Sequence, residues 1–368
     1  MARARRVGRQ DIKPETTPAA VDSLIGARFE AQKLVFGPIL FQAVRMLRDL
    51  GVLTALRSVR SGLTFEQIAP EVSISRYGLR VLLEAGLAAG VVRAEDERYI
   101  LTRTGACILS DELTRINLNL VQDCCFRAIY YLEDSIRQGR PVGLQEVFGN
   151  QGTIYPSLPA FPEPARTSWY QWDHYYSDAA FPEALQIVFR RDHRRLLDVG
   201  GNTGKWAVQC VRHAPGVSVT ILDLPEVAEV ARQEVDKLGL QERIATQAFD
   251  LMDHARPFPV GYDAIWMSQL LVCFSEDDVQ RLLERAASAM TPDTMLYILD
   301  TFWDRQEFEV SAYCLQATSL YFTCLANGCS RMYRASEIQT MAEAAGLVVE
   351  NITDNIGICS SLFACRRK

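Results

Sequence analysis

Apolar and polar residues follow two different patterns along this chain of 368 residues. Before about residue 190, apolar side chains recur mainly at helical spacing, three or four positions apart. From residue 194 onward, short apolar runs such as RLLDVG, VSVTILDL and TMLYILDTF alternate with helical stretches. Strands that alternate with helices are typical of a mostly parallel sheet with helices on both faces. We therefore predict an α/β fold for the second part of the chain.

The N-terminal part predicts a smaller unit. Residues 39–57 have the pattern of two short helices that break at Gly51. Two further helices and then two strands joined by the charged turn AEDER follow, at residues 64–71, 74–87, 90–93 and 98–102. This order of elements is that of a winged helix-turn-helix.

The chain is expected to divide into three segments. Its basic and polar start, residues 1–34, predicts a flexible tail, since the apolar stretch of a secretory signal does not follow it. The winged-helix unit is assigned to residues 35–108. Residues 109–368 are expected to combine a helical lid with the sheet domain.

A winged helix that binds DNA would turn four side chains toward the major groove, namely Ser75, Arg76, Tyr77 and Arg80. However, the segment SRYGLRVLLEAGLAAG has few basic or amide side chains and much apolar surface. The net charge of −6 also argues against nucleic acid as the main partner. We therefore expect a protein–protein module and no nucleic-acid partner.

Composition and cysteine usage narrow the function further. Hydrophobic residues make up 48% of the chain, and no apolar run approaches the ~18 residues that span a bilayer. We expect a soluble, cytoplasmic protein without a membrane partner. The ten cysteines form neither CxxC pairs nor clusters with histidine, so we expect reduced thiols and no metal site.

A glycine-rich turn, GGNTG, follows the first strand of the sheet domain. Gly200, Gly201 and Gly204 let the backbone turn sharply and approach a ligand closely, and the next helix offers unpaired backbone amides. The spacing differs from the GxGxxG that accommodates a pyrophosphate. We therefore predict a site for an adenosine compound without phosphate groups.

Acidic residues at the next two strands extend this site. Asp223 ends the second strand, where a carboxylate can accept hydrogen bonds from both ribose hydroxyls. Asp250 and Leu251 follow the third strand and are expected beside the adenine ring. Because the carboxyl ends of parallel strands meet at one edge of a sheet, we expect one continuous adenosine site.

With these motifs, residues 35–368 resemble the family of small-molecule O-methyltransferases, which includes caffeate, acetylserotonin and hydroxyneurosporene methyltransferases. LLDVGGNTG is similar to the family's LVDVGGGTG, TILDLPEV with Asp223 and Leu224 to its DLPHV motif, FDLMD to its GDMF segment, and SRMYRASEIQTMAEAAGL, more weakly, to its ERT-x-x-E-W helix. The resemblance implies a Rossmann-like class I methyltransferase sheet with S-adenosylmethionine as cofactor. It also implies a homodimer, in which the winged helix is the dimerisation domain and closes the partner's active site.

The catalytic segment departs from the family. Where O-methylating members read approximately MKWVLHDWSDE, this chain reads MSQLLVCFSEDD. The resemblance places Ser268 at the position of a lysine that contacts the cofactor and Val272 at that of the histidine that deprotonates the hydroxyl. Of the two acidic partners of that histidine, Asp300 is retained and Ser330 replaces the other. A valine cannot accept a proton, so the family's usual general base is missing.

Two explanations stay open for a reaction without that histidine. The acceptor can already be nucleophilic, as an enolisable carbon, an indole-like carbon or an amine is, so that positioning provides most of the acceleration. Alternatively, another residue is the base. His174, within WDHYYSD, is the candidate, as base or substrate ligand, against the alternative of a histidine packed in an aromatic lid. Cys273, next to Val272, is interpreted as a packing residue.

The resemblance makes residues 309–326 the helix that lines the substrate pocket. Four side chains with polar groups and three aromatic side chains are expected to form this pocket: Tyr313, Gln316, Tyr321 and Asn327, with Trp172, Tyr176 and Trp303. We therefore predict an S-adenosylmethionine-dependent methyltransferase for a small aromatic secondary metabolite, with an oxygen, carbon or nitrogen acceptor. The alternatives are a non-methylating enzyme of the same fold and a winged-helix regulator that senses a metabolite.

Overall fold

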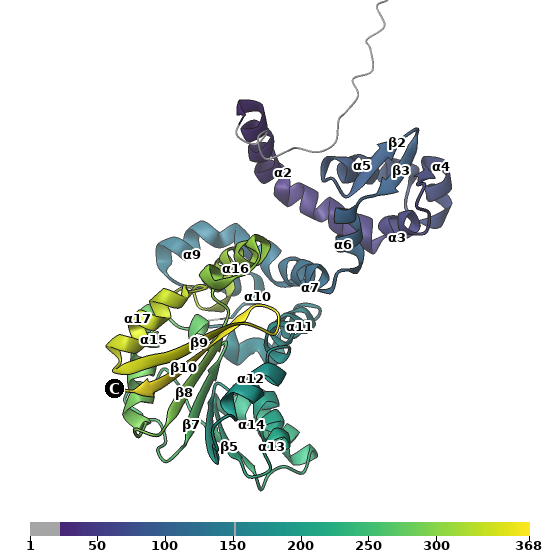
Figure 1. Cartoon of the computed structure of the whole chain (residues 1–368). Coiled ribbons are helices and arrows are strands. Elements are labelled where there is room, and N and C mark those ends of the chain that lie inside the picture. Colours follow the sequence, from purple (N-terminus) through teal and green to yellow (C-terminus); the bar gives the residue numbers. More distant parts are fainter. Residues whose placement is uncertain (1–22, 151) are drawn as a thin grey trace, which may run out of the picture. The chain divides into compact units, whose positions relative to one another are not determined.

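The computed structural model describes residues 23–150 and 152–368, which divide between Leu118 and Asn119 into two compact units (Figure 1). This division lies later in the chain than the predicted boundary at residue 108. The reason is helix α6 (Arg103–Ser110), whose Ile108 and Leu109 pack against the hydrophobic core of the smaller unit.

The smaller unit consists of helices around a three-stranded antiparallel sheet of order β1-β3-β2. Its elements are α2 (Leu24–Asp49), α3 (Val52–Arg57), β1 (Leu63–Thr64), α4 (Phe65–Ile68), α5 (Arg76–Ala88), β2 (Val92–Glu95) and β3 (Arg98–Leu101). Leu47, Leu53 and Leu83 are fully buried in its core. The order of helices and strands is the one predicted for a winged helix.

Helix α2 corrects the prediction at the start of the chain. The Ser23 hydroxyl caps it by accepting a hydrogen bond from the Gly26 backbone N–H at 3.0 Å, so residues 24–34 are helical and do not belong to a flexible tail. Residues 1–22, the rest of the predicted tail, lie outside the described residues. The first helix is also long, with 26 residues, rather than short.

The two arginines considered for DNA contact are engaged within the smaller unit. The Arg76 guanidinium forms an ion pair with Glu66 and lies 4.8 Å from the ring centroid of Phe65. The Arg80 guanidinium lies over the same ring at 4.7 Å. Cations held in this way pack onto their own domain. The protein–protein module stays a prediction of the sequence.

The larger unit contains a seven-stranded sheet of order β6-β5-β4-β7-β8-β10-β9. Its strands are β4 (Arg195–Val199), β5 (Ser218–Asp223), β6 (Ile244–Ala248), β7 (Ala264–Ser268), β8 (Met295–Asp300), β9 (Leu347–Ile356) and β10 (Ser360–Arg367). The first five of these are parallel, and β10 runs antiparallel to both β8 and β9. The predicted Rossmann-like α/β fold is therefore confirmed.

Helices cover both faces of this sheet (Figure 1). One face carries α12 (Phe181–Val188), α13 (Lys205–His213) and α14 (Pro225–Lys237), and the other carries α15 (Glu276–Ala289) and α17 (Ala335–Ala344). Successive residues of β8 alternate between the two cores, since Leu296 and Ile298 belong to one and Tyr297 and Leu299 to the other.

Further helices form a lid over the carboxyl ends of the parallel strands. They are the π-helical turn η2 (Val121–Cys125), α8 (Phe126–Ala128), the 3₁₀ turn η3 (Ile129–Tyr131), α9 (Leu132–Gln138), α10 (Val142–Phe148), the 3₁₀ turn η4 (Tyr155–Ala160), α11 (Ala165–Asp178), α16 (Glu309–Tyr321) and the π-helical turn η7 (Phe322–Ala326). The chain passes from the smaller unit to the larger one within α7 (Glu112–Leu120). Other 3₁₀ turns in the described residues are η1 (Ala69–Glu71) in the smaller unit and η5 (Leu271–Cys273) and η6 (Trp303–Arg305) in the larger one.

Candidate active site

A cavity of about 480 Å³ lies within the larger unit, at the carboxyl ends of β4, β5, β7 and β8. Each of these strands contributes a polar side chain at or near its end, namely Asp198, Asp223, Ser268 and Asp300. The opposite wall comes from η4, α11 and α16. In parallel sheets of this type the carboxyl edge is where ligands bind.

The GGNTG turn closes one end of the cavity. Gly200 and Gly201 line it. A Cβ atom on Gly201 would come within 2.7 Å of the Asp198 Oδ2 atom, so only glycine fits there. Gly204 does not line the cavity: it has φ +81°, which favours glycine, and it is the N-cap of α13. Gly204 was predicted to lie beside the ligand, but it instead gives the backbone the left-handed conformation with which α13 begins.

Asp223 is held by two backbone amides. The N–H of Asn202 donates to its Oδ2 atom and the N–H of Leu224 to its Oδ1 atom, each at 2.8 Å. Burial raises the pKa of Asp223, and these two hydrogen bonds oppose the rise. A carboxylate has about four lone-pair sites, so this one keeps acceptor capacity for a ligand. Leu224 also lines the cavity.

The remaining residues of the predicted adenosine site lie along the same wall. Asp250 stands two positions after the end of β6 and accepts a hydrogen bond from the Met252 N–H at 2.8 Å. Asp250, Leu251 and Ser268 all line the cavity. The structure thus brings the ends of four strands into one continuous surface.

Asp198 and Asp300 are two buried carboxyl groups in this cavity, and within the described part of the chain the Oδ2 atom of each has no hydrogen-bond partner. Burial raises the pKa of Asp198 to about 8, and the charge of Asp223 adds to the effect. Burial also raises the pKa of Asp300 to about 7, against hydrogen bonds from the backbone of Thr301 and Val272. The Oδ2 atom of each group thus lacks the donor or cation that a buried carboxylate oxygen requires.

Val272 lines the cavity on the short turn η5, beside Cys273. Burial raises the pKa of the Cys273 thiol to about 12, so it stays protonated and is no nucleophile. The Asn327 side chain also lines the cavity, but its Nδ2 atom donates to the Cys273 carbonyl at 2.7 Å and to the Ser330 hydroxyl at 2.8 Å. Asn327 therefore holds the loop that carries it.

His174 lines the cavity from α11. Its Nδ1 atom lies 3.6 Å from Asp178 Oδ1 and 4.0 Å from Asp173 Oδ2, and its ring stacks on Tyr170. The Lys205 ammonium forms a closer ion pair with Asp178, at 2.6 Å. The imidazole therefore lines the cavity and also contacts Asp178 and Tyr170 of its own helix.

Three predicted pocket residues do not line the cavity. Tyr313 and Gln316 are exposed on the outer face of α16, and the Trp303 ring lies under the Arg334 guanidinium at 4.5 Å. The face of α16 and η7 that lines the cavity carries the predicted Tyr321 together with Leu315, Thr318 and Phe322. These residues recur every three or four positions, as residues on one face of a buried helix do. This spacing indicates the face that lines the cavity better than the polarity of single side chains does.

Trp172 and Tyr176, as predicted, lie on the cavity wall, together with α11 and η4 residues that the prediction missed. The Trp169 indole N–H donates to the Tyr321 hydroxyl at 2.6 Å, and the Trp172 ring packs against Tyr321 at 5.5 Å. Other unpredicted lining residues are Tyr155, Tyr170, Asp173 and Asn202. The part of the cavity lined by η4, α11 and Tyr321, called the acceptor end below, therefore has aromatic walls.

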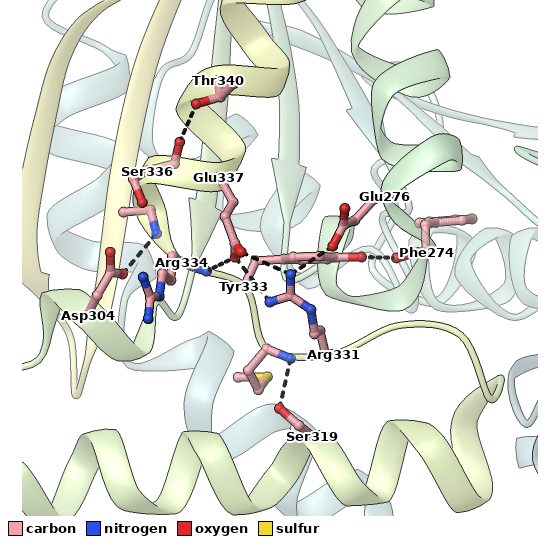
Figure 2. A network of polar contacts seen from close by, with 12 residues as sticks. Phe274, Glu276, Asp304, Ser319, Arg331, Tyr333, Arg334, Ser336, Glu337 and Thr340 are labelled. Atoms are coloured by element: carbon pink, nitrogen blue, oxygen red, sulfur yellow. Dashed lines mark hydrogen bonds and ion pairs between the residues drawn. The ribbon is translucent and has the colours of Figure 1, made fainter. Parts of the chain in front are cut away.

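A polar network fixes the segment that follows α16 (Figure 2). The Arg331 guanidinium binds Glu337 of α17 at 2.9 and 3.0 Å and Glu276 of α15 at 2.7 Å. The Tyr333 hydroxyl donates to the Phe274 carbonyl at 2.7 Å, and the Met332 N–H donates to Ser319 of α16 at 3.2 Å. The network joins the segments that carry Phe274 and Met332 into the cavity.

Comparison with known proteins decides the family. The sequence profile of the O-methyltransferase domain matches residues 129–348, which is more than half of the chain. The chain belongs to this O-methyltransferase family. It is an S-adenosylmethionine-dependent methyltransferase of the type found in secondary metabolism. A second profile, the Dimerisation2-like domain, matches residues 28–99 of this methyltransferase.

Two curated relatives and one solved structure illustrate the similarity. The methyltransferase is 26% identical over 260 residues, 70% of each chain, to L-tyrosine C(3)-methyltransferase of Streptomyces lavendulae. It is 30% identical over 154 residues, 42% of each chain, to the mitomycin biosynthesis 6-O-methyltransferase of the same species. The crystal structure of the S-adenosylmethionine-dependent methyltransferase SibL superposes with a TM-score of 0.70 at 26% identity, over 92% of this chain and 98% of SibL.

The cavity residues of this methyltransferase fit the cofactor. S-adenosylmethionine carries a ribose diol, an adenine amino group, an ammonium group and a sulfonium, and the cavity offers the carboxylates of Asp223, Asp250 and Asp198. An acidic surface suits a ligand with a net positive charge. The described residues contain no cluster of three or more metal-ligating side chains and no helix able to span a membrane.

Proposed function

We propose that the strand ends that line this cavity hold S-adenosylmethionine in one orientation. Asp223 accepts the ribose hydroxyls, Asp250 and Leu251 adjoin the adenine, and the turn at Gly200 and Gly201 adjoins the methionyl part. The two amides that fix Asp223, at 2.8 Å, support this assignment because they leave the carboxylate oriented toward the cavity. When bound, the cofactor supplies an electrophilic methyl group.

We propose further that the acceptor is a phenol-like aromatic metabolite, that Asp300 is the general base, and that a ring carbon receives the methyl group. The observation that carries this proposal is the buried, unpartnered Oδ2 atom of Asp300 beside Val272. A base acts best when its pKa is near the working pH. Asp300 accepts the hydroxyl proton, and the charge of the phenolate makes the ring carbons next to the oxygen nucleophilic.

The relative named L-tyrosine C(3)-methyltransferase supports a carbon acceptor, and the aromatic side chains of Trp169, Trp172 and Tyr321 support a flat substrate. These side chains hold the ring of the acceptor in one orientation, and this positioning accelerates the methyl transfer. Loss of the ring proton to solvent then restores the aromatic system. His174 stays a prediction as an alternative base or substrate ligand.

One experiment tests this function. The purified enzyme is incubated with methyl-labelled cofactor and a set of phenols, indoles and keto acids, and the product is analysed by mass spectrometry and NMR. We expect S-adenosylhomocysteine in equal amount to a product with a new ring C–CH₃ group. A methoxy or N-methyl product would disprove the carbon assignment, and product without S-adenosylhomocysteine would disprove methyl transfer.

We also propose that two copies of the chain associate through the N-terminal unit. The Dimerisation2-like profile over residues 28–99 supports this, as do the exposed apolar side chains of α2, including Phe29, Leu34 and Ile39. Exposed apolar stripes of this kind usually bind another protein surface. Light scattering on the purified protein is expected to give twice the chain mass of 41.3 kDa. The cytoplasmic location stays a prediction of the sequence.

A further inference from the structure

Asp173 is a cavity-lining carboxylate for which the proposed function gives no role. It belongs to α11. On one side, the Asn202 side-chain amide of the glycine-rich turn donates to its Oδ2 atom at 3.4 Å. On the other side are Tyr155 and Cys273 at the acceptor end, whose pKa values are raised in part by its negative charge.

The cations near Asp173 are directed to another carboxylate. Lys205 forms its 2.6 Å ion pair with Asp178, and His174 Nδ1 is closer to Asp178 than to Asp173, at 3.6 Å against 4.0 Å. At Asp178, burial raises the pKa, but hydrogen bonds from His174 and Lys205 outweigh it and lower the pKa to about 2. Asp178 therefore has a cation that neutralises its charge, whereas Asp173 on the same helix has none in such close contact.

Asp173 shows the opposite balance. Burial raises its pKa to about 6, and the opposing charges of His174 and Lys205 do not offset this effect. Its hydrogen bond from Asn202 is at the long limit for such a contact. The Asp173 side chain is only partly exposed, at 20%, and a carboxylate with little access to water is costly unless a cation or several donors bind it. The surroundings also suit a cation, because the aromatic rings of Tyr170 and Trp172 line the same wall.

We propose that Asp173 is the binding site for a primary ammonium group of a ligand in this cavity. The inference rests on the proposed binding of S-adenosylmethionine here. An ammonium group has two possible sources: the α-ammonium of the methionyl part of the cofactor, which the contact with Asn202 favours, and an amine on the methyl acceptor. The chemistry of recognition is the same in both, a charge-assisted hydrogen bond to one carboxylate.

The cofactor source is tested by calorimetric titration with two ligands. S-adenosylhomocysteine carries the α-ammonium, and 5′-methylthioadenosine has the same adenosine and thioether without the amino acid. If the cofactor supplies the ammonium, Asp173→Asn weakens the first ligand about ten-fold or more and leaves the second within two-fold. Asp223→Asn is the matched control, since loss of the ribose contact weakens both ligands to the same extent.

The acceptor source is tested on the enzyme saturated with S-adenosylhomocysteine. Tyramine and 4-ethylphenol share the phenol ring and differ in the amine. If the acceptor supplies the ammonium, the wild-type enzyme binds tyramine about ten-fold more tightly than 4-ethylphenol, and Asp173→Asn removes this preference. In this case the affinity for S-adenosylhomocysteine is the same in the variant and the wild type.

The proposal is overturned if Asp173→Asn changes neither preference, or if it weakens 5′-methylthioadenosine as much as S-adenosylhomocysteine. The second result would mean that the residue acts through the fold of the adenosine site. Unchanged binding of 5′-methylthioadenosine also shows that the variant is folded. Because every measurement is of binding, the result does not depend on which atom is methylated or on whether Asp300 is the base.

Discussion

The backbone N–H of Val272 donates a hydrogen bond to the carboxyl group of Asp300, and both residues line the cavity. The Thr301 N–H donates to the same group at 2.8 Å. The Oδ2 atom of Asp300 is buried and, among the residues that the structure describes, has no hydrogen-bond partner. Burial raises the pKa of Asp300, and these two backbone hydrogen bonds oppose the rise.

The first prediction concerns the base. Because burial raises the pKa of Asp300 to about 7, the carboxylate form gains population as the pH rises, and kcat/KM is expected to increase up to about pH 7 and then level off. Asp300→Asn keeps the shape but cannot accept the proton, and we expect kcat to fall about 100-fold or more. The measurement is the pH profile of both enzymes with a phenol substrate. Full turnover of Asp300→Asn would exclude it as the base.

The second prediction concerns stability without cofactor. The pKa of Asp198 is raised by burial to about 8, above the value of 3.8 for an unfolded chain. A raised pKa means that the contribution of this group to folding is complete below about pH 4 and is lost as the pH rises toward 8. Asp198→Asn is always neutral, so its stability relative to the wild type should increase over this range, by about 1–3 kcal/mol at pH 8.

Melting temperatures of both proteins from pH 5 to pH 8, in the absence of ligand, measure this effect. Asp123→Asn is a suitable control, because that carboxylate lies outside the cavity and accepts a hydrogen bond from Ser168 at 2.6 Å. A constant difference between Asp198→Asn and the wild type across the range would contradict the prediction.

The sequence predicts the sheet and the strand-end part of the site well, for a physical reason. Buried parallel strands are continuous apolar runs, and the residues directly after them lie at one edge, so Gly200, Asp223 and Asp250 could be grouped without coordinates. Gly204 is the exception. Its spacing resembles that of a ligand-binding glycine, but its positive φ serves the start of α13.

The lid was less predictable, because which face of a helix meets a cavity depends on neighbours far away in sequence. On α16, Tyr313 and Gln316 appeared to be pocket residues by their polarity, yet they point outward while Thr318 and Tyr321 line the cavity. Asp173 and Asp178 look equivalent in the segment WDHYYSD. Only the fold shows that Lys205 pairs with one of them.

The third prediction tests the close approach of the glycine-rich turn. A methyl group on Gly201 would come within 2.7 Å of the Asp198 Oδ2 atom and 2.8 Å of Ile221, so the turn must shift. We expect Gly201→Ala to weaken S-adenosylhomocysteine about ten-fold or more, as measured by calorimetry. Gly37→Ala is the matched control, since a methyl group there meets no atom within 4 Å. Equal affinity of both variants would mean that the turn does not contact the ligand.

The fourth prediction concerns the network around Arg331, which joins α15, α17 and the segment carrying Met332 (Figure 2). Lysine cannot bind Glu337 with two parallel hydrogen bonds, so Arg331→Lys should loosen this segment and the Phe274 segment at the acceptor end. We expect KM for the acceptor to rise about three- to ten-fold, with the affinity for S-adenosylhomocysteine unchanged. Arg232→Lys, an exposed ion pair on α14, serves as control and should change neither value. If Arg331→Lys lowered cofactor affinity and left KM unaltered, the network would instead support the adenosine end of the cavity.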